Sequence, residues 1–110
     1  MEILDSDAAN IQADILVQKI KYYLITIFGR VLDEANPDEY YRALCYALRE
    51  SIMTNWQATA QTWTNKNVRT VFYLSMEYLP GRFLNNNIVN LKLNDVVQMV
   101  LKRQIVHFTI

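Results

Sequence analysis

The sequence predicts an α/β protein in which N-terminal helices precede the first strand of an open sheet. Apolar residues recur at three- and four-residue steps from about Gln12 to Thr64, which is typical of amphipathic helices. The run Val71–Met76 is instead β-branched, aromatic and uncharged, which is typical of a buried strand. The chain has 110 residues, of which 52% are hydrophobic and 20% charged, so the composition is that of one folded domain.

The first predicted helix runs from about Gln12 to Val31, after a polar segment, 1–10, that we expect to be loosely ordered. Its last part contains the β-branched segment 25–27, which weakens the helical propensity. Gly29 is an early stop signal that could end the helix near Phe28.

The second predicted helix has the strongest local signal in the chain. Asn36 stands at the N-cap, Pro37 at the first helical position and Glu39 at the third, which is a capping-box arrangement. Its apolar stripe comprises Tyr41, Leu44, Cys45, Leu48, Ile52 and Trp56. We expect this helix to continue to about Thr64.

The predicted strand, Val68–Met76, ends at a break formed by Leu79, Pro80 and Gly81. Short helices are expected over 84–91 and 94–104, followed by a tail, 105–110, that is rich in β formers. A strand that is apolar on both faces needs neighbours, because each unpaired buried backbone group costs about 1–3 kcal/mol. The chain therefore resembles the beginning of a larger α/β protein, and alone it is expected to be marginally folded and to self-associate.

Composition excludes several classes of function. One cysteine rules out an internal disulfide and a multi-cysteine metal site, and two glycines rule out a phosphate-binding glycine-rich loop. The longest nearly apolar run, Tyr22–Phe28, is too short to span a bilayer, and the acidic N-terminus is not a secretory signal, so a cytoplasmic location is expected. Residues 1–55 carry nine acids and five bases and residues 56–110 carry two acids and six bases, but the bases are dispersed and do not indicate nucleic-acid binding.

Several residues that could carry chemistry have simpler interpretations. His107 lies in the apolar tail without a nearby acid, and Cys45 lies on a packed helix stripe, so neither is predicted to be catalytic and no metal site is expected. Trp56 and Trp63 lie seven residues apart on one helix face. Aromatic side chains in this arrangement could stack on a sugar or a base, but core packing is the favoured interpretation.

Glu77 is the strongest site candidate. It follows the apolar run and precedes Arg82 by five residues, at the C-terminal end of a predicted strand, where open α/β sheets bind ligands. The residues leave two interpretations open: a ligand-facing carboxylate, or an ion pair between Glu77 and Arg82 that closes the turn.

The segment 71–91 resembles the glycogen (α-1,4-glucan) phosphorylases, which share a Tyr-Leu-Ser-Met/Leu-Glu strand, a Gly-Arg turn and an Asn-rich helix ending in Asn-Leu. The residues Tyr40–Leu44, Arg49-Glu50 and Trp56 are also similar to that family. The family-like part is 37–91, and Leu79 resembles the bacterial branch. From about Val96 the sequence departs from the family, so 96–110 is interpreted as a divergent tail, either truncated or frame-shifted.

The resemblance implies an N-terminal fragment of a pyridoxal-phosphate-dependent glycosyltransferase that transfers glucosyl units from α-glucan to phosphate. It implies an incomplete N-terminal domain of the glycosyltransferase-B type over 1–110, and a homodimeric family. Glu77 would be a polar group of the active site, and Gly81 and Arg82 would be structural at the turn. The cofactor lysine and the family's glycine-rich loop are not present in this sequence, so no cofactor is expected on this chain and the chain alone is expected to be inactive. The alternative is a small, non-enzymatic helical interaction module.

Overall fold

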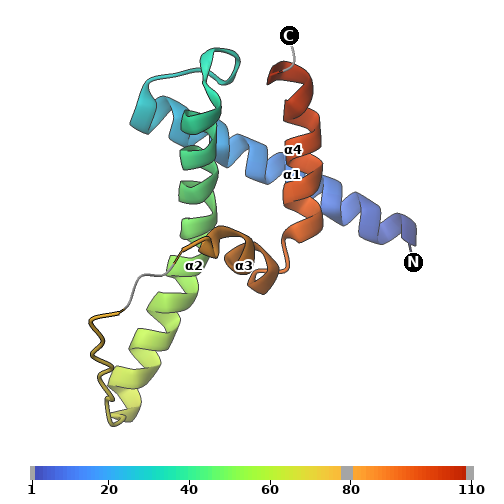
Figure 1. Ribbon diagram of the computed structural model, residues 1–110. Coiled ribbons are helices and arrows are strands. Elements are labelled where there is room, and N and C mark those ends of the chain that lie inside the picture. The colour runs from blue at the N-terminus through green and yellow to red at the C-terminus, as the bar shows by residue number, and fades with distance from the viewer. Residues whose placement is uncertain (1, 78–80, 109–110) are drawn as a thin grey trace.

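The structure is a computed structural model that describes the backbone of residues 2–77 and 81–108 and the side chains of 6–77 and 81–104. Figure 1 shows an arrangement of helices that cross one another. The elements are α1 (Glu2–Tyr23), the π-helical η1 (Leu24–Phe28), the 3-10 helix η2 (Leu32–Glu34), α2 (Pro37–Lys66), α3 (Phe83–Asn90) and α4 (Asn94–Phe108).

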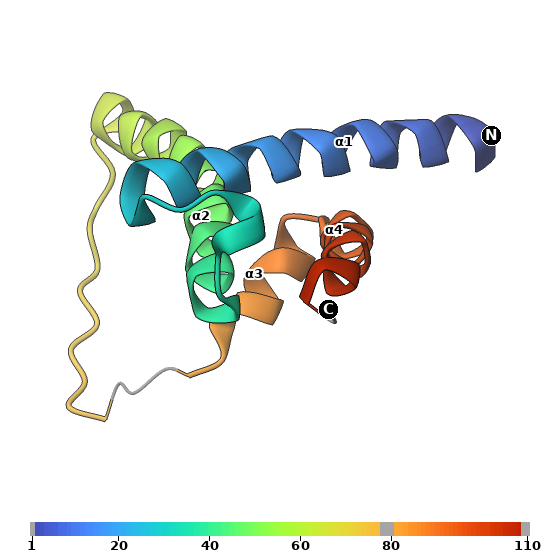
Figure 2. The same ribbon diagram turned by 90° about the horizontal axis from the view of Figure 1, so that it is seen from above.

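The predicted α/β class is wrong, because the described residues form helices and contain no strand. The segment 68–77, expected to be a strand buried on both faces, is extended and loops away from the helices in Figure 2. Val71, Leu74 and Met76 are 92%, 93% and 102% exposed. A strand requires hydrogen bonds from a neighbouring strand, and no other described segment provides one. High β propensity alone therefore leaves this segment extended but unpaired.

The first helix is longer than the periodicity predicted. The residues expected to be loosely ordered at the N-terminus are helical from Glu2, and α1 passes into the π-helical turn η1. The helical backbone ends at Phe28, three residues before the predicted end at Val31 and at the alternative stop that Gly29 offered. Gly29 has φ 63°, a left-handed conformation that favours glycine, and its N–H bonds to the Ile25 carbonyl at 3.1 Å.

The predicted start of α2 is confirmed in detail. Asn36 Oδ1 accepts a hydrogen bond from the Glu39 N–H at 2.8 Å, and Glu39 Oε2 accepts one from the Asn36 N–H at 3.2 Å. This capping box satisfies two backbone donors that the helix itself leaves unpaired. The helix ends at Lys66, two residues beyond the predicted end, and Asn67 follows in the left-handed conformation.

The core lies where α1, the first half of α2, and α4 meet, with α3 beside them (Figure 1). Its buried apolar residues are Ala13, Leu16, Ile20 and Leu24 before α2, Ala35, Tyr40, Ala43, Leu44, Ala47 and Leu48 around the start of α2, and Ile88, Val96, Val97 and Val100 in α3 and α4. The helix α4 continues to Phe108, so the β-rich composition after residue 104 does not end it. The segment 96–110, predicted to be a divergent tail, thus contributes core side chains.

The molecule is open. Its radius of gyration is 17.3 Å, compared with about 13 Å for a compact chain of this length. The distal half of α2 extends beyond the helices that pack on its first half (Figure 1). None of the described helices has both the length and the apolar character required to cross a membrane.

Tyr40 gives the core a dependence on pH. Its side chain is 5% exposed, and burial raises its pKa to about 12 from an ordinary value of 10. The unfolded chain loses the Tyr40 proton near pH 10, whereas the folded chain keeps it to about pH 12. The folded state is therefore fully stable with respect to this group below pH 10, and it loses stability as the pH rises from 10 to 12. We expect the free energy of unfolding, measured with urea, to fall by up to about 3 kcal/mol over that range through this group.

The Tyr40→Phe variant isolates this effect from other groups that titrate at high pH. Its free energy of unfolding should lack the Tyr40 part of the decline, whereas Tyr41→Phe, at an exposed neighbour, should retain it. Identical curves for Tyr40→Phe and the parent protein between pH 10 and 12 would contradict this expectation.

Candidate functional site

The structure places the predicted site residue Glu77 at the end of the extended segment between α2 and α3. Its side chain is exposed, and its backbone N–H bonds to Ser75 Oγ at 3.2 Å. Because the part of the chain that the structure describes forms no sheet, Glu77 does not lie at the end of a buried strand. Within the described residues, 2–77 and 81–108, its carboxylate makes no ion pair with Arg82, so the turn-closing interpretation gains no support.

Arg82 stands at the N-cap of α3, as expected for the residue that begins the helix. Its φ is 57°, and its side chain does not cap the helix. A Cβ added at Gly81 would meet no atom within 4 Å, so the described part of the chain imposes no steric requirement for glycine there. The predicted break at Leu79 and Pro80 lies outside the described residues.

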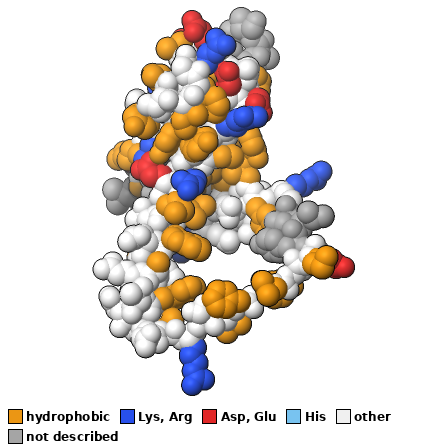
Figure 3. All heavy atoms as spheres, turned by 90° about the vertical axis from the view of Figure 1, so that its left-hand side faces the viewer, with side chains coloured by type: hydrophobic (Ala, Val, Ile, Leu, Met, Phe, Trp, Pro, Cys, Tyr) orange, Lys and Arg blue, Asp and Glu red, His pale blue; other side chains and the backbone are white. Residues whose placement is uncertain are grey.

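The extended segment and the distal half of α2 expose large apolar side chains. Trp56 and Trp63 are 65% and 55% exposed, so the expectation that they pack in the core is wrong. Phe72 and Tyr73 are each 81% exposed. Figure 3 shows apolar side chains spaced along the loop.

Sequence reasoning missed a cluster of tyrosines between α1 and α2. The rings of Tyr23 and Tyr46 stack with centroids 5.8 Å apart, and Tyr22 meets Tyr23 edge to face at 5.3 Å. The Tyr23 hydroxyl donates a hydrogen bond to Glu50 Oε2 at 3.2 Å, and Lys19 Nζ pairs with Glu50 Oε1 at 3.2 Å. Burial and the adjacent Glu50 carboxylate raise the pKa of Tyr23, so Tyr23 remains a neutral donor. No sequence pattern could have identified this cluster, because the contact between Tyr23 and Tyr46 depends on how α1 and α2 cross.

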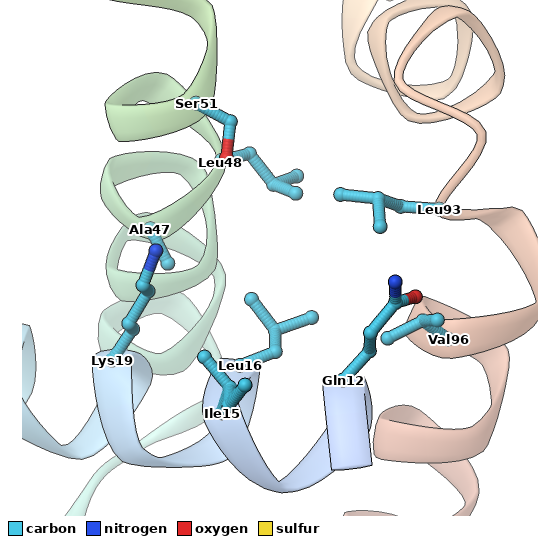
Figure 4. A pocket seen from close by; sticks show the side chains of 9 residues that line it. All are labelled: Gln12, Ile15, Leu16, Lys19, Ala47, Leu48, Ser51, Leu93 and Val96. Carbon is cyan, nitrogen blue, oxygen red and sulfur yellow. The ribbon is translucent and has the colours of Figure 1, made fainter. Parts of the chain in front are cut away.

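A pocket of about 170 Å³ lies where α1, α2 and the start of α4 meet (Figure 4). Its floor is apolar, and Lys19, Gln12 and Ser51 are the polar side chains that line it. The Lys19 ammonium pairs with Glu50, which makes it unsuitable as a free amine. The pocket has no histidine or carboxylate in its lining, so no general base is present to activate the Ser51 hydroxyl.

The remaining candidates have no catalytic geometry. Cys45 is half-buried, and burial raises the pKa of its thiol against the smaller, lowering effect of a hydrogen bond from Tyr41, which makes the thiol a poor nucleophile. The side chain of His107 lies outside the described residues. Among the residues the structure describes, no cluster of three metal-ligating side chains occurs.

The chain is similar to known enzymes over most of its length. It is 32% identical over 99 residues to glycogen phosphorylase from Synechocystis sp. and 36% identical over 91 residues to glycogen phosphorylase from Pasteurella multocida. These matches cover 90% and 83% of this chain but 12% and 11% of the two relatives. It is also 41% identical over 61 residues to alpha-glucan phosphorylase 1 from Arabidopsis thaliana.

The longer matches cover 99 and 91 residues and so extend beyond the family-like segment 37–91. The chain spans about one eighth of the length of the curated relatives it matches. No protein-family profile and no solved structure matches the chain.

Proposed function

We propose that this chain forms part of the N-terminal domain of an enzyme that cleaves α-1,4-glucan with inorganic phosphate. The premise is that the chain belongs to the glycogen phosphorylase family. The observation that carries the proposal is the 32–36% identity to two bacterial phosphorylases over 83–90% of the chain. The reaction would release glucose 1-phosphate. The chain corresponds to about one eighth of such an enzyme, so the complete reaction requires residues that this sequence does not contain.

The exposed apolar surface supports a role as one part of a larger protein. Five large side chains of the segment 71–76 are 81–102% exposed. Burying them against further polypeptide would gain about 1.5–3 kcal/mol for each large side chain. The second candidate function is a small interaction module, which would use the same exposed side chains to bind a partner. The exposed Trp56 and Trp63 are compatible with either function.

We propose Glu77 as the residue of this chain that contributes to the active site. It is a carboxylate held on an extended segment, exposed and without an ion-pair partner among the described residues. Those properties suit a group that positions substrate or ordered water when the rest of the enzyme closes over it. Gly81 and Arg82 would set the turn into α3.

Pyridoxal phosphate is the cofactor that membership of this enzyme class implies, and it supplies a phosphate group for proton transfer when bound. The described residues do not fit it. Lys19 is the lysine that lines the described pocket, and its ammonium is engaged by Glu50 at 3.2 Å. The chain contains two glycines and no glycine-rich phosphate loop. We therefore assign none of these residues to the cofactor.

A chimera tests the proposal. The matching segment of the Synechocystis phosphorylase would be replaced by this chain, and glucose 1-phosphate release from glucan would be measured. We expect the chimera to be active and the purified 110-residue chain to release no more product than a protein-free control. A folded but inactive chimera would favour the interaction module. Product formed by the chain alone would overturn the proposal that the reaction requires residues outside this chain.

A further inference from the structure

The residues 71–76, here called the apolar segment, present both of their sides to solvent. Successive side chains of an extended chain point to opposite sides, and the neighbours Phe72 and Tyr73 are equally exposed, at 81% each. Figure 3 shows open space between the loop and the helices. A partner can therefore reach the apolar segment from either side, which is impossible for a strand that lies on a core.

The backbone of the apolar segment is also available for hydrogen bonding. The Val68 N–H bonds to the Trp63 carbonyl at 3.3 Å and completes the end of α2. From residue 69 to residue 76, no backbone group pairs with another backbone group of the described residues. At about 3.3 Å per residue, the apolar segment offers roughly 20 Å of unpaired main chain, which is the length of an ordinary strand.

Basic residues flank the apolar segment on both sides. Lys66 and Arg69 precede it, Arg82 follows it, and the acid Glu77 lies between it and Arg82. The three basic side chains are exposed, and among the described side chains none of them forms an ion pair. The apolar segment itself carries no charge. A complementary partner therefore has an apolar channel with acidic groups at its two ends.

A lipid surface is a poor partner for the apolar segment, although apolar residues flanked by basic ones also occur in membrane-binding elements. Unpaired backbone groups carry a large cost in free energy in hydrocarbon, so an open extended chain is excluded from the membrane interior. A flat surface would also contact one side of the segment only. A protein groove meets both requirements, because it can hydrogen-bond the main chain and enclose the side chains on both sides.

We propose that the apolar segment is the binding site for a chaperone-type protein whose groove encloses one extended chain, bonds its backbone and carries acidic groups at its rim. The segment already has the extended conformation that such a groove accepts, so little ordering is needed on binding. Phe72 and Leu74 lie two residues apart and therefore on the same side of the chain. They are 81% and 93% exposed, and they form the centre of the interface.

The exposed apolar residues of α2 do not fit the same groove. Trp56 and Trp63 are 65% and 55% exposed, but they lie within the helix Pro37–Lys66, whose backbone groups bond to one another. The two tryptophans therefore provide a matched control, in which apolar exposure occurs without a free backbone.

The proposal goes beyond the proposed function, because it concerns the chain while the residues that would bury the apolar segment in a complete enzyme are absent. Its test measures the formation of a complex, whereas the chimera measures glucose 1-phosphate. The failure of either proposal is therefore distinguishable from the failure of the other.

Isothermal titration calorimetry of the full chain with an ATP-dependent chaperone that encloses one extended peptide tests the proposal. The ADP-bound chaperone should bind the chain, and ATP should release it. Phe72→Ser/Leu74→Ser should weaken binding about a hundredfold, because two large apolar side chains leave the interface. Trp56→Ser/Trp63→Ser should bind as the parent chain does. Absence of binding to the ADP-bound chaperone, or equal weakening in the two double variants, would overturn the proposal.

Leu74→Pro and Leu74→Ala separate recognition of the backbone from apolar contact. Proline keeps an apolar side chain but removes one N–H donor, whereas alanine keeps the donor and shortens the side chain. Leu74→Pro should therefore weaken binding more than Leu74→Ala, and the reverse order would overturn the proposed groove.

Cosedimentation with vesicles of phosphatidylserine and phosphatidylcholine tests the lipid alternative. The chain should stay in the supernatant. Sedimentation that Phe72→Ser/Leu74→Ser abolishes would show that the apolar segment binds lipid, and it would overturn the proposal.

Discussion

In the active chimera, Glu77→Gln is expected to lower turnover about a hundredfold while changing the free energy of unfolding by no more than about 1 kcal/mol. The small effect on stability follows from the structure. The Glu77 side chain is exposed and makes no ion pair with Arg82 within the described residues, so its charge can be removed without leaving a buried partner unsatisfied. The large effect on turnover follows if the carboxylate orients substrate or water, because lost geometry at a reacting centre commonly costs about this factor.

Two variants accompany this measurement. Glu34→Gln neutralises an exposed acid in η2, and we expect it to leave both turnover and stability unchanged. Arg82→Ala reports on the alternative interpretation of Glu77 as half of an ion pair that forms in the complete enzyme. A Glu77→Gln chimera that keeps its turnover but melts at a clearly lower temperature would discard the active-site role and support the ion pair.

Val100→Asp is expected to unfold the isolated chain. Val100 is 0% exposed and lies in α4 where it packs against α1. An unpaired carboxylate at such a site costs several kcal/mol, against a total stability of about 5–15 kcal/mol for ordinary domains. Far-ultraviolet circular dichroism during a urea titration should show little or no cooperative transition in this variant.

The matched control for Val100→Asp is Gln98→Asp, which makes the same change in charge at an exposed position of the same helix. We expect its free energy of unfolding to stay within about 0.5 kcal/mol of the parent protein. Equal stability of the two variants would show that α4 does not pack on α1, and that residues after 96 are dispensable for the fold.

Predictions from the sequence were most accurate where neighbouring residues interact. The capping box at Asn36 depends on hydrogen bonds between residues three apart, and it is confirmed. The first helix ends at Phe28, the alternative stop that Gly29 offered, and not at the predicted Val31. The relation to glycogen phosphorylases was also recognisable from the segment 71–91, and it is shown by the comparisons. In these cases the residues that decide the outcome lie close together in the sequence.

Predictions failed where the outcome depends on distant partners. Residues 68–77 have the composition of a strand, yet the described chain offers no second strand, so they remain extended and exposed. The assignment of Trp56 and Trp63 to the core failed for a related reason, because the helix stripe continues beyond the part of α2 on which α1 packs. Helical periodicity identifies a face that can be buried, but it does not specify how much of that face has a partner.

The sequence by itself determined the N-terminal cap of α2 and the relation to a phosphorylase segment. Only the tertiary structure decided the all-helical class of the described residues, the contribution of α4 to the core, and the exposure of the segment 71–76. The physical reason is the distance along the chain between the residues that interact. Caps and turns are local hydrogen-bond arrangements, whereas strand pairing and burial depend on which surfaces the rest of the chain brings together.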